Sequence, residues 1–88
     1  MNEQELNKKL NEWAGTKDID YTDPELGIVY CFKSLVPKLE SYEIRLNHGK
    51  HCAWVKLPAR YTEFGMAETP AHALCLAIEK LIDNRGRL

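Results

Sequence analysis

The sequence predicts an α+β fold: two N-terminal helices, then an antiparallel β-hairpin or three-stranded sheet, then a C-terminal helix packed on the sheet as a layered sandwich. Three observations lead to this prediction. Residues 65–84 carry apolar side chains at the spacing of one helix face. Residues 42–57 alternate apolar and polar side chains, as half-buried strands do. Residues 2–39 contain two shorter helical patterns. A chain of 88 residues is expected to form a single domain, residues 1–88, around one modest core.

The composition excludes several classes of protein. A net charge of −1 argues against non-specific binding of nucleic acid by bulk charge. No apolar run approaches the roughly 18–20 residues of a membrane span, and the polar N-terminus does not resemble a signal peptide. Cys31, Cys52 and Cys75 are an odd number of cysteines, far apart and inside apolar patterns. We therefore expect reduced, buried thiols in a small, soluble, cytoplasmic protein.

The first helix is predicted over residues 2–13. Leu6, Leu10 and Trp13 recur at four- and three-residue spacing, and the remaining positions are polar. Asn2 is placed to cap the helix, because its side chain can accept a hydrogen bond from a free N–H of the first turn. Three apolar residues are too few to stabilise an isolated helix. This helix must therefore dock on another element.

The second helix is predicted to follow Asp23 and Pro24, a cap residue and a proline suited to the first helical position. Pro37 lies within the apolar pattern that follows. A proline there removes a backbone hydrogen bond and clashes with the preceding turn. The sequence therefore predicts either a helix end near Leu35 or a kink with one further turn to about Leu39.

Two alternating segments, Tyr42–Asn47 and His51–Leu57, predict a β-hairpin. Gly49 lies in the connection, where a tight turn requires positive φ. The expected cross-strand pairs are Leu46 with His51, Ile44 with Ala53, and Tyr42 with Val55. This register places both apolar rows on one sheet face. Arg60–Met66 is expected to form a third strand or an extended return.

The last helix is predicted to begin after Thr69, a cap residue, with Pro70 in the first helical position. Gly86 is suited to its C-terminal cap. Apolar residues beyond its main stripe indicate that this helix is covered on more than one side. The predicted core consists of Ile28, Phe32, Leu35, Tyr42, Ile44, Ala53, Val55, Leu57, Leu74, Ile78 and Leu81.

Two short motifs have the residue types of a reactive site. Asp18 and Asp20 match the DxDxT signature of haloacid-dehalogenase-type phosphotransferases, but no strand pattern precedes them as that chemistry requires. His48, His51 and Cys52 offer three ligand types in five residues, and no fourth ligand has suitable spacing for zinc. We therefore predict no catalysis, no cofactor and no metal. A phosphohydrolase based on the two aspartates is the alternative.

An interaction surface is predicted instead. On the second sheet face, Arg45 and Trp54 are diagonal neighbours that could stack. This face is either solvated or covered by another element or a partner. Trp13, Trp54, Ala73 and Leu76 lie off the faces assigned to the core. Burying such a surplus favours a homodimer with Trp54 or Leu76 near the contact. The alternative is that the N-terminal helix buries these residues within one chain.

The order of elements resembles the phage ABA sandwich domain of small phage and prophage proteins. The likeness rests on Leu6–Trp13, on Asp20–Pro24 leading into Phe32–Leu39, and on Ala67–Pro70 opening an apolar helix. It implies a sheet with helices on both faces, which would cover Trp54. It also implies a phage or prophage origin, and it carries no catalytic residues.

A second likeness, to HicB-type antitoxins, covers only Tyr42–Asp83. It rests on a strand, a turn, a strand containing Trp54–Pro58, and a helix entered through Gly65 and Thr69. That family neutralises a small RNase toxin through a partial RNase H-like fold. The expected function is that of a phage-type accessory protein acting by binding, with an antitoxin-like module as the alternative.

Overall fold

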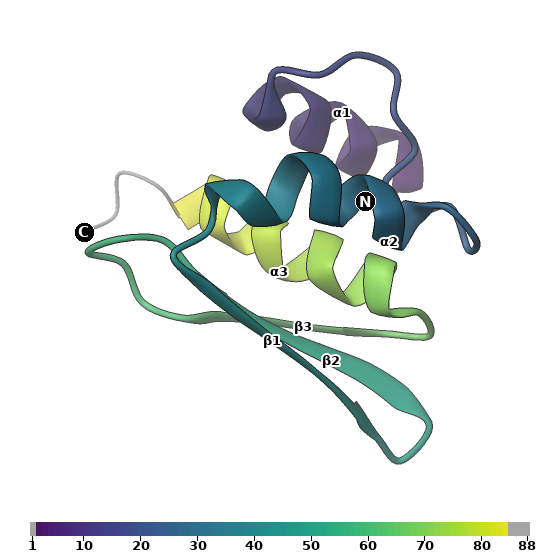
Figure 1. Ribbon diagram of the computed structural model, residues 1–88, viewed down its shortest axis with the longest axis vertical. Helices are drawn as coiled ribbons and strands as arrows, with labels where there is room; N and C mark the ends of the chain where they lie inside the picture. Colours follow the sequence, from purple (N-terminus) through teal and green to yellow (C-terminus); the bar gives the residue numbers. More distant parts are fainter. Residues whose placement is uncertain (1, 85–88) are drawn as a thin grey trace.

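A computed structural model describes residues 2–84. The elements, in chain order, are α1 (Glu3–Ala14), α2 (Gly27–Tyr30), the π-type turn η1 (Cys31–Leu35), the 3-10 turn η2 (Val36–Lys38), β1 (Ser41–Asn47), β2 (Lys50–Lys56), β3 (Glu63–Ala67) and α3 (Pro70–Asn84). The predicted α+β arrangement is confirmed: an N-terminal helix leads, and α3 packs on a three-stranded antiparallel sheet (Figure 1).

The strands lie in the order β1-β2-β3, and both neighbouring pairs are antiparallel. Every predicted hairpin pair is confirmed: Leu46 opposite His51, Ile44 opposite Ala53, and Tyr42 opposite Val55. His48 and Gly49 form the turn with φ of 52° and 78°. Positive φ at both residues is the signature of a type I′ turn, whose twist matches that of the strands.

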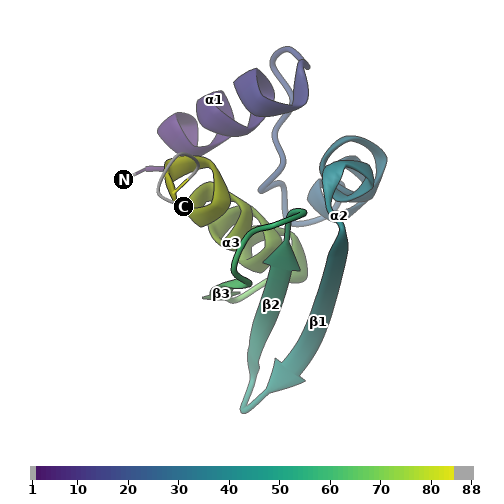
Figure 2. The same cartoon turned by 90° about the vertical axis from the view of Figure 1, so that its left-hand side faces the viewer.

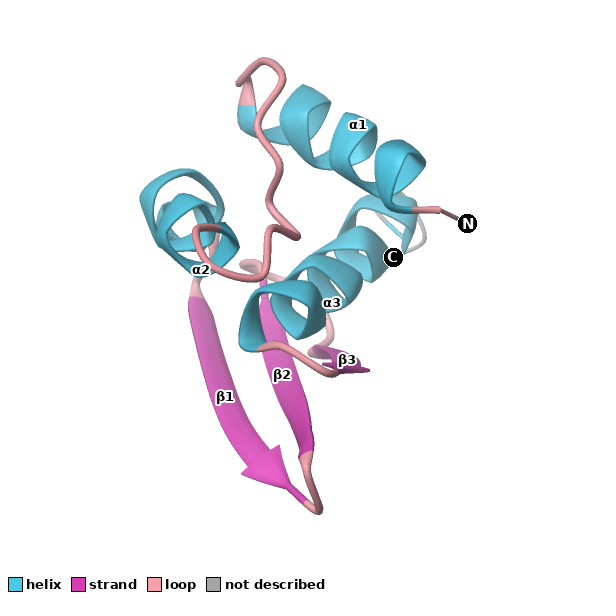
Figure 3. Ribbon diagram, turned by 90° about the vertical axis from the view of Figure 1, so that its right-hand side faces the viewer, coloured by secondary structure: helices cyan, strands magenta, loops and turns pink. Residues whose placement is uncertain are grey.

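The helices all lie on one side of the sheet. In Figure 1, α1, α3 and the sheet follow one another from top to bottom, and α2 lies beside α3. Figures 2 and 3 view the molecule from opposite sides and show α3 against β2 and β3, with β1 at the rim. The apolar stripe of α1, Leu6 and Leu10, is buried in the same cluster as α3. No further helix in residues 2–84 covers the opposite face, so the two-sided cover implied by the phage-domain resemblance is not present there.

The core lies between α3, α1 and the inner face of β2. Six predicted core residues are fully buried or nearly so: Leu35, Ala53, Val55, Leu74, Ile78 and Leu81. Three more are partly buried against them: Ile28, Ile44 and Leu57. Ala73, which the helix pattern places off the core, is fully buried. Its backbone lies against β3, where a Cβ on Gly65 would be only 2.4 Å from the Ala73 carbonyl oxygen.

The prediction was wrong for Phe32 and Tyr42, which are 39% and 46% exposed. Their rings meet edge to face, with centroids 5.4 Å apart. The physical reason is the position of α3, which covers β2 and β3 and leaves β1 largely uncovered (Figure 3). The core instead includes Tyr21, a residue of the polar connection before α2.

The second helical segment continues through Pro37 as a kinked helix. A regular turn in α2 widens in η1 and then tightens in η2, which ends at Lys38 with Leu39 as its C-cap. The prediction of one further turn to about Leu39 is therefore confirmed. The change of helix type accommodates the proline ring and its missing N–H. None of the helices in residues 2–84 has both the length and the apolar character needed to cross a membrane.

The predicted caps on the long helices are present. The Asn2 side chain accepts from the Glu5 N–H at 2.9 Å, and the Thr69 hydroxyl accepts from the His72 N–H at 3.1 Å. Gly15 ends α1 with φ of 74°. Gly86, predicted to cap α3, lies outside the described residues.

The second helix begins at Gly27 and not at Pro24 as predicted, and Asp23 caps the turn that precedes it. This Asp23 contact should stabilise the fold in a pH-dependent way. Hydrogen bonds from the Leu26 and Glu25 N–H groups lower the pKa of the Asp23 carboxyl. A lowered folded-state pKa means that the stabilisation is present above the unfolded-state pKa and is lost as the pH falls through the folded-state pKa. In urea unfolding, Asp23→Ala should therefore lower stability at neutral pH, and the difference from wild type should shrink in acid. Glu12→Ala, at an exposed carboxylate of α1, is the control. A difference that stays constant with pH would contradict this assignment.

Candidate functional site

The sheet face opposite α3 is the main candidate for a functional surface. On β3, Gly65 backs onto α3, so the alternating neighbours Phe64 and Met66 project to the opposite side. Trp54 lies opposite Phe64, and Cys52 lies opposite Met66. We call the set Cys52, Trp54, Phe64 and Met66, with the charged residues around it, the open face.

The centre of the open face is apolar. The rings of Trp54 and Phe64 pack against each other, with centroids 5.1 Å apart and planes tilted by 52°. Met66 is 52% exposed beside them, whereas Cys52 is buried. An aromatic pair flanked by a flexible thioether is a surface that can adapt to an apolar anchor of another molecule.

Ion pairs surround this centre. Arg45 pairs with Glu43, Lys50 with Glu68, and Lys56 with Glu40. The hydrogen bond from Lys50 lowers the pKa of the Glu68 carboxyl. Each of these three cations has a carboxylate partner, so the three pairs are electrically neutral. An apolar centre with a charged, balanced rim is the anatomy of a protein–protein contact surface.

Two cations also approach the aromatic rings. The Arg45 Cζ lies 5.9 Å from the centroid of the Trp54 ring, as the predicted diagonal placement requires. Lys80 reaches around the edge of β3, where its Nζ lies 5.9 Å from the Phe64 ring centroid and donates to the Phe64 carbonyl oxygen at 2.6 Å. Both contacts hold the rings in place from the sides.

Leu76 is not part of this surface. Its Cβ would lie 3.1 Å from a Cβ on Gly65, on the helix side of the sheet, and the side chain borders a hollow with Leu6 and His72. The structure therefore brings Arg45 and Trp54 together and separates Leu76 from both. Phe64 and Met66 were missed because residues 60–66 were not assigned to a strand with a defined face. Their alternation about Gly65 is the signal that could have identified them.

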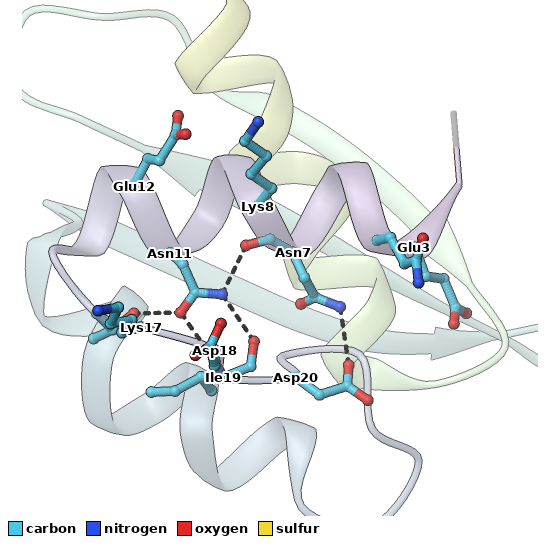
Figure 4. A pocket seen from close by; sticks show the side chains of 11 residues that line it. Glu3, Asn7, Lys8, Asn11, Glu12, Lys17, Asp18, Ile19 and Asp20 are labelled. Carbon is cyan, nitrogen blue, oxygen red and sulfur yellow. Dashed lines mark hydrogen bonds between the residues drawn. The ribbon is translucent and has the colours of Figure 1, made fainter.

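The two aspartates of the DxDxT motif lie in the loop between α1 and α2, not at the end of a strand. A groove of about 560 Å³ lies between this loop and α1. Asn7 and Asn11 are turned towards the loop (Figure 4). Asp20 Oδ1 accepts from the Asn7 side chain at 2.9 Å and from the Thr22 hydroxyl at 2.8 Å. Asp18 is exposed, with φ of 57°.

The asparagines of this groove hold the loop in place. Asn7 Oδ1 accepts from the Tyr21 N–H at 2.8 Å. Asn11 donates to the Ile19 carbonyl at 2.9 Å and accepts from the Thr16 hydroxyl at 2.8 Å. These bonds direct the Tyr21 ring into the core, where it is fully buried. Asn7 and Asn11 therefore attach the loop to α1.

The surroundings of the candidate metal ligands and of the candidate nucleophilic cysteines do not suit a reactive role. No group of at least three His, Cys, Asp or Glu side chains within residues 2–84 is arranged to hold a metal ion, including His48, His51 and Cys52. The three cysteines are free and buried, as predicted. Cys31 and Cys75 face each other with Sγ atoms 3.8 Å apart. Hydrogen bonding to Cys31 and burial raise the pKa of the Cys75 thiol, which disfavours the nucleophilic thiolate.

No protein-family model, curated protein or solved structure matches this chain. The described residues therefore define the protein by its physical features alone: a small α+β domain with helices on one side of the sheet and an apolar, charge-balanced face on the other.

Proposed function

We propose that this chain is a small phage- or prophage-type accessory protein of the bacterial cytoplasm that acts by binding another protein and not by catalysis. The observation that carries the binding role is the open face, where Met66 is exposed and Trp54 and Phe64 are partly exposed, with no helix of residues 2–84 covering them. The phage or prophage origin rests on the resemblance of the sequence alone. Contiguous apolar surface rimmed by polar residues marks an interaction site on a soluble domain.

The charges of the open face favour a protein partner over nucleic acid. Binding to phosphate groups requires cations that are free to replace counterions. Here Arg45, Lys50 and Lys56 are each paired with a carboxylate. The matching partner surface offers an apolar side chain to the Trp54–Phe64 pair, surrounded by charges of both signs.

The surroundings of the candidate reactive groups support binding over catalysis. Asp20 is engaged in hydrogen bonds that hold its own loop, and Cys31 and Cys75 are buried. The phosphohydrolase alternative nevertheless makes a clear prediction of its own. Magnesium-dependent phosphatase activity that is lost in Asp18→Asn would overturn the proposal of a binding protein.

Trp54→Ser should weaken partner binding by about 30-fold, because a central aromatic residue of an interface contributes about 2 kcal/mol or more. The partner is first identified in the bacterial host by photo-crosslinking from position 66, with position 12 on α1 as the background. The purified partner is then titrated against wild type and Trp54→Ser by calorimetry.

Tyr61→Ser is the matched control, because Tyr61 is 83% exposed and lies in the loop outside the open face. It should leave the affinity unchanged. Equal affinities for wild type and Trp54→Ser, with both proteins folded by circular dichroism, would exclude the open face as the binding surface.

The antitoxin-like alternative is favoured by one feature. The likeness to HicB-type antitoxins rests on a hairpin and a following helix, and the structure has both, with β3 between them and α3 on one face of the sheet. Co-purification with a small RNase toxin, and inhibition of that toxin by this chain, would favour the antitoxin role. The gene neighbourhood separates the two origins, since phage structural genes or an adjacent toxin gene point to different roles.

A further inference from the structure

The outer edge of β1 is unpaired in the described structure. β2 is its only neighbour in the sheet, and Figure 3 shows no other segment alongside its outer side. An edge strand presents a row of free N–H and C=O groups, which readily pair with another strand. The seven residues of β1, Ser41–Asn47, are long enough for such pairing.

The hairpin determines which backbone groups of β1 point outward. The type I′ turn at His48 and Gly49 closes on Asn47 and Lys50 as a hydrogen-bonded pair. Hydrogen-bonded and non-hydrogen-bonded pairs then alternate along the strand. The N–H and C=O groups that point away from β2 are those of Tyr42, Ile44 and Leu46.

The opposite edge of the sheet agrees with this alternation. Hydrogen-bonded and non-hydrogen-bonded pairs alternate between β2 and β3 as well, and Trp54–Phe64 is a non-hydrogen-bonded pair. The Phe64 carbonyl therefore points to the outer edge of β3. That carbonyl accepts a hydrogen bond from Lys80 Nζ at 2.6 Å. The free edge of β3 is thus partly occupied by a side chain from α3.

The side chains of β1 complement a second copy of the same strand. In an antiparallel pair centred on Ile44, Tyr42 of each copy lies opposite Leu46 of the other, and Glu43 lies opposite Arg45. Ile44 lies opposite its own counterpart. The central pair joins residues with outward-pointing backbone groups, so it is a hydrogen-bonded pair, as are the two pairs of Tyr42 with Leu46.

Exposed apolar surface lies where this pairing would cover it. Leu46 is 67% exposed and Tyr42 46%, both on the helix side of the sheet beyond the reach of α3. Phe32, which meets the Tyr42 ring, is 39% exposed. A Leu46 side chain from a second copy would lie beside Tyr42 and next to Phe32, so each copy would cover an apolar side chain of the other.

We propose that this protein forms a two-fold symmetric homodimer in which the β1 strands pair antiparallel about Ile44 and join the two sheets into one. Glu43 and Arg45, which pair within one chain, would also meet with opposite charge across the two-fold axis, and together with the exposed Tyr42 and Leu46 this favours a second copy as the occupant of this edge. The contact differs from the homodimer expected at Trp54 or Leu76, and it leaves the apolar centre of the open face uncovered in both copies.

Charge reversal tests the pairing and its register. Glu43→Lys brings like charges together at two symmetric positions, so it should weaken dimerisation by about tenfold in sedimentation equilibrium. Arg45→Glu should do the same. The double variant Glu43→Arg/Arg45→Glu restores opposite charges across the axis and should dimerise like wild type.

Glu12→Lys is the control, since it makes the same charge change on α1 without touching β1. Glu43 and Arg45 are well exposed, so these variants should fold, which circular dichroism checks. Monomer mass for wild type at tens of micromolar would overturn the proposal. A wild-type dimer that Glu43→Lys weakens no more than Glu12→Lys does would also overturn it.

Amide hydrogen exchange gives a second test that needs no substitution. The N–H groups of Glu43 and Arg45 bond to β2 and should be protected at every protein concentration. Those of Tyr42, Ile44 and Leu46 should become protected only at concentrations where the dimer forms. Alternating residues of one strand thus serve as internal controls. Rapid exchange of these three amides in a dimeric sample would place the contact elsewhere and overturn the proposal.

Discussion

Replacing Ile78 with alanine is expected to lower the free energy of unfolding by about 2–5 kcal/mol, the range for truncating a fully buried aliphatic side chain. Ile78 has no exposed surface and belongs to the cluster that joins α3 to the sheet. The residues around Ile78 belong to α1, α3 and the sheet, which also pack on one another. They cannot move in far enough to fill the cavity that the shorter alanine side chain leaves. Urea unfolding monitored by tryptophan fluorescence measures the loss.

Ile82→Ala is the matched control for this variant. Ile82 lies one turn later on α3 and is only partly buried against the core. The same change of side chain should therefore cost clearly less there. A loss below about 0.5 kcal/mol at Ile78, the size typical of a surface substitution, would show that the residue is not at the centre of the core.

Gly65→Ala should destabilise the domain by about 3 kcal/mol, the upper end of the range for overpacking. A Cβ at this position would lie 2.4 Å from the Ala73 carbonyl oxygen and 2.6 Å from the Ala77 nitrogen. Both are backbone atoms of α3, so no side chain can rotate away to relieve the clash. The helix must instead move off β3, which also disturbs the packing of its fully buried neighbours.

Met66→Ala separates this close approach from a general effect on the strand. Met66 is the next residue of β3 but projects from the open face, so its truncation should leave the distance between α3 and the sheet unchanged. Urea unfolding of both variants measures the difference. If Gly65→Ala were as stable as wild type, α3 could not lie as close to β3 as the structure places it.

The hairpin illustrates what could be predicted from local sequence. The alternation of Tyr42, Ile44 and Leu46 defines one face, and the turn at Gly49 leaves few possible registers, so the pairing was predicted correctly. The caps at Asn2 and Thr69 were equally accessible, because a cap depends on residues within one helical turn.

The loop before α2 illustrates the opposite case. Tyr21 lies among polar and acidic residues, a pattern that indicates exposed loop, yet it is fully buried. The Asn7 side chain of α1, fourteen positions earlier in the chain, accepts a hydrogen bond from the Tyr21 N–H. The Thr16 hydroxyl lies 2.6 Å from the Tyr21 phenol oxygen. Such bonds depend on how a loop folds back onto a helix, which neither periodicity nor composition describes.

The sequence by itself determined the α+β class, the hairpin register, the caps at Asn2 and Thr69, and the buried state of the cysteines. Each depends on the periodicity or chemistry of residues close together in the chain. Tertiary structure alone decided that α3 covers β2 and β3 but not β1. It thereby exposed Tyr42 and Phe32, placed Leu76 apart from Trp54, and left the Trp54–Phe64 face without a helix. The physical reason is that an apolar side chain favours burial without specifying its partner, and the choice among partners depends on packing between elements far apart in sequence.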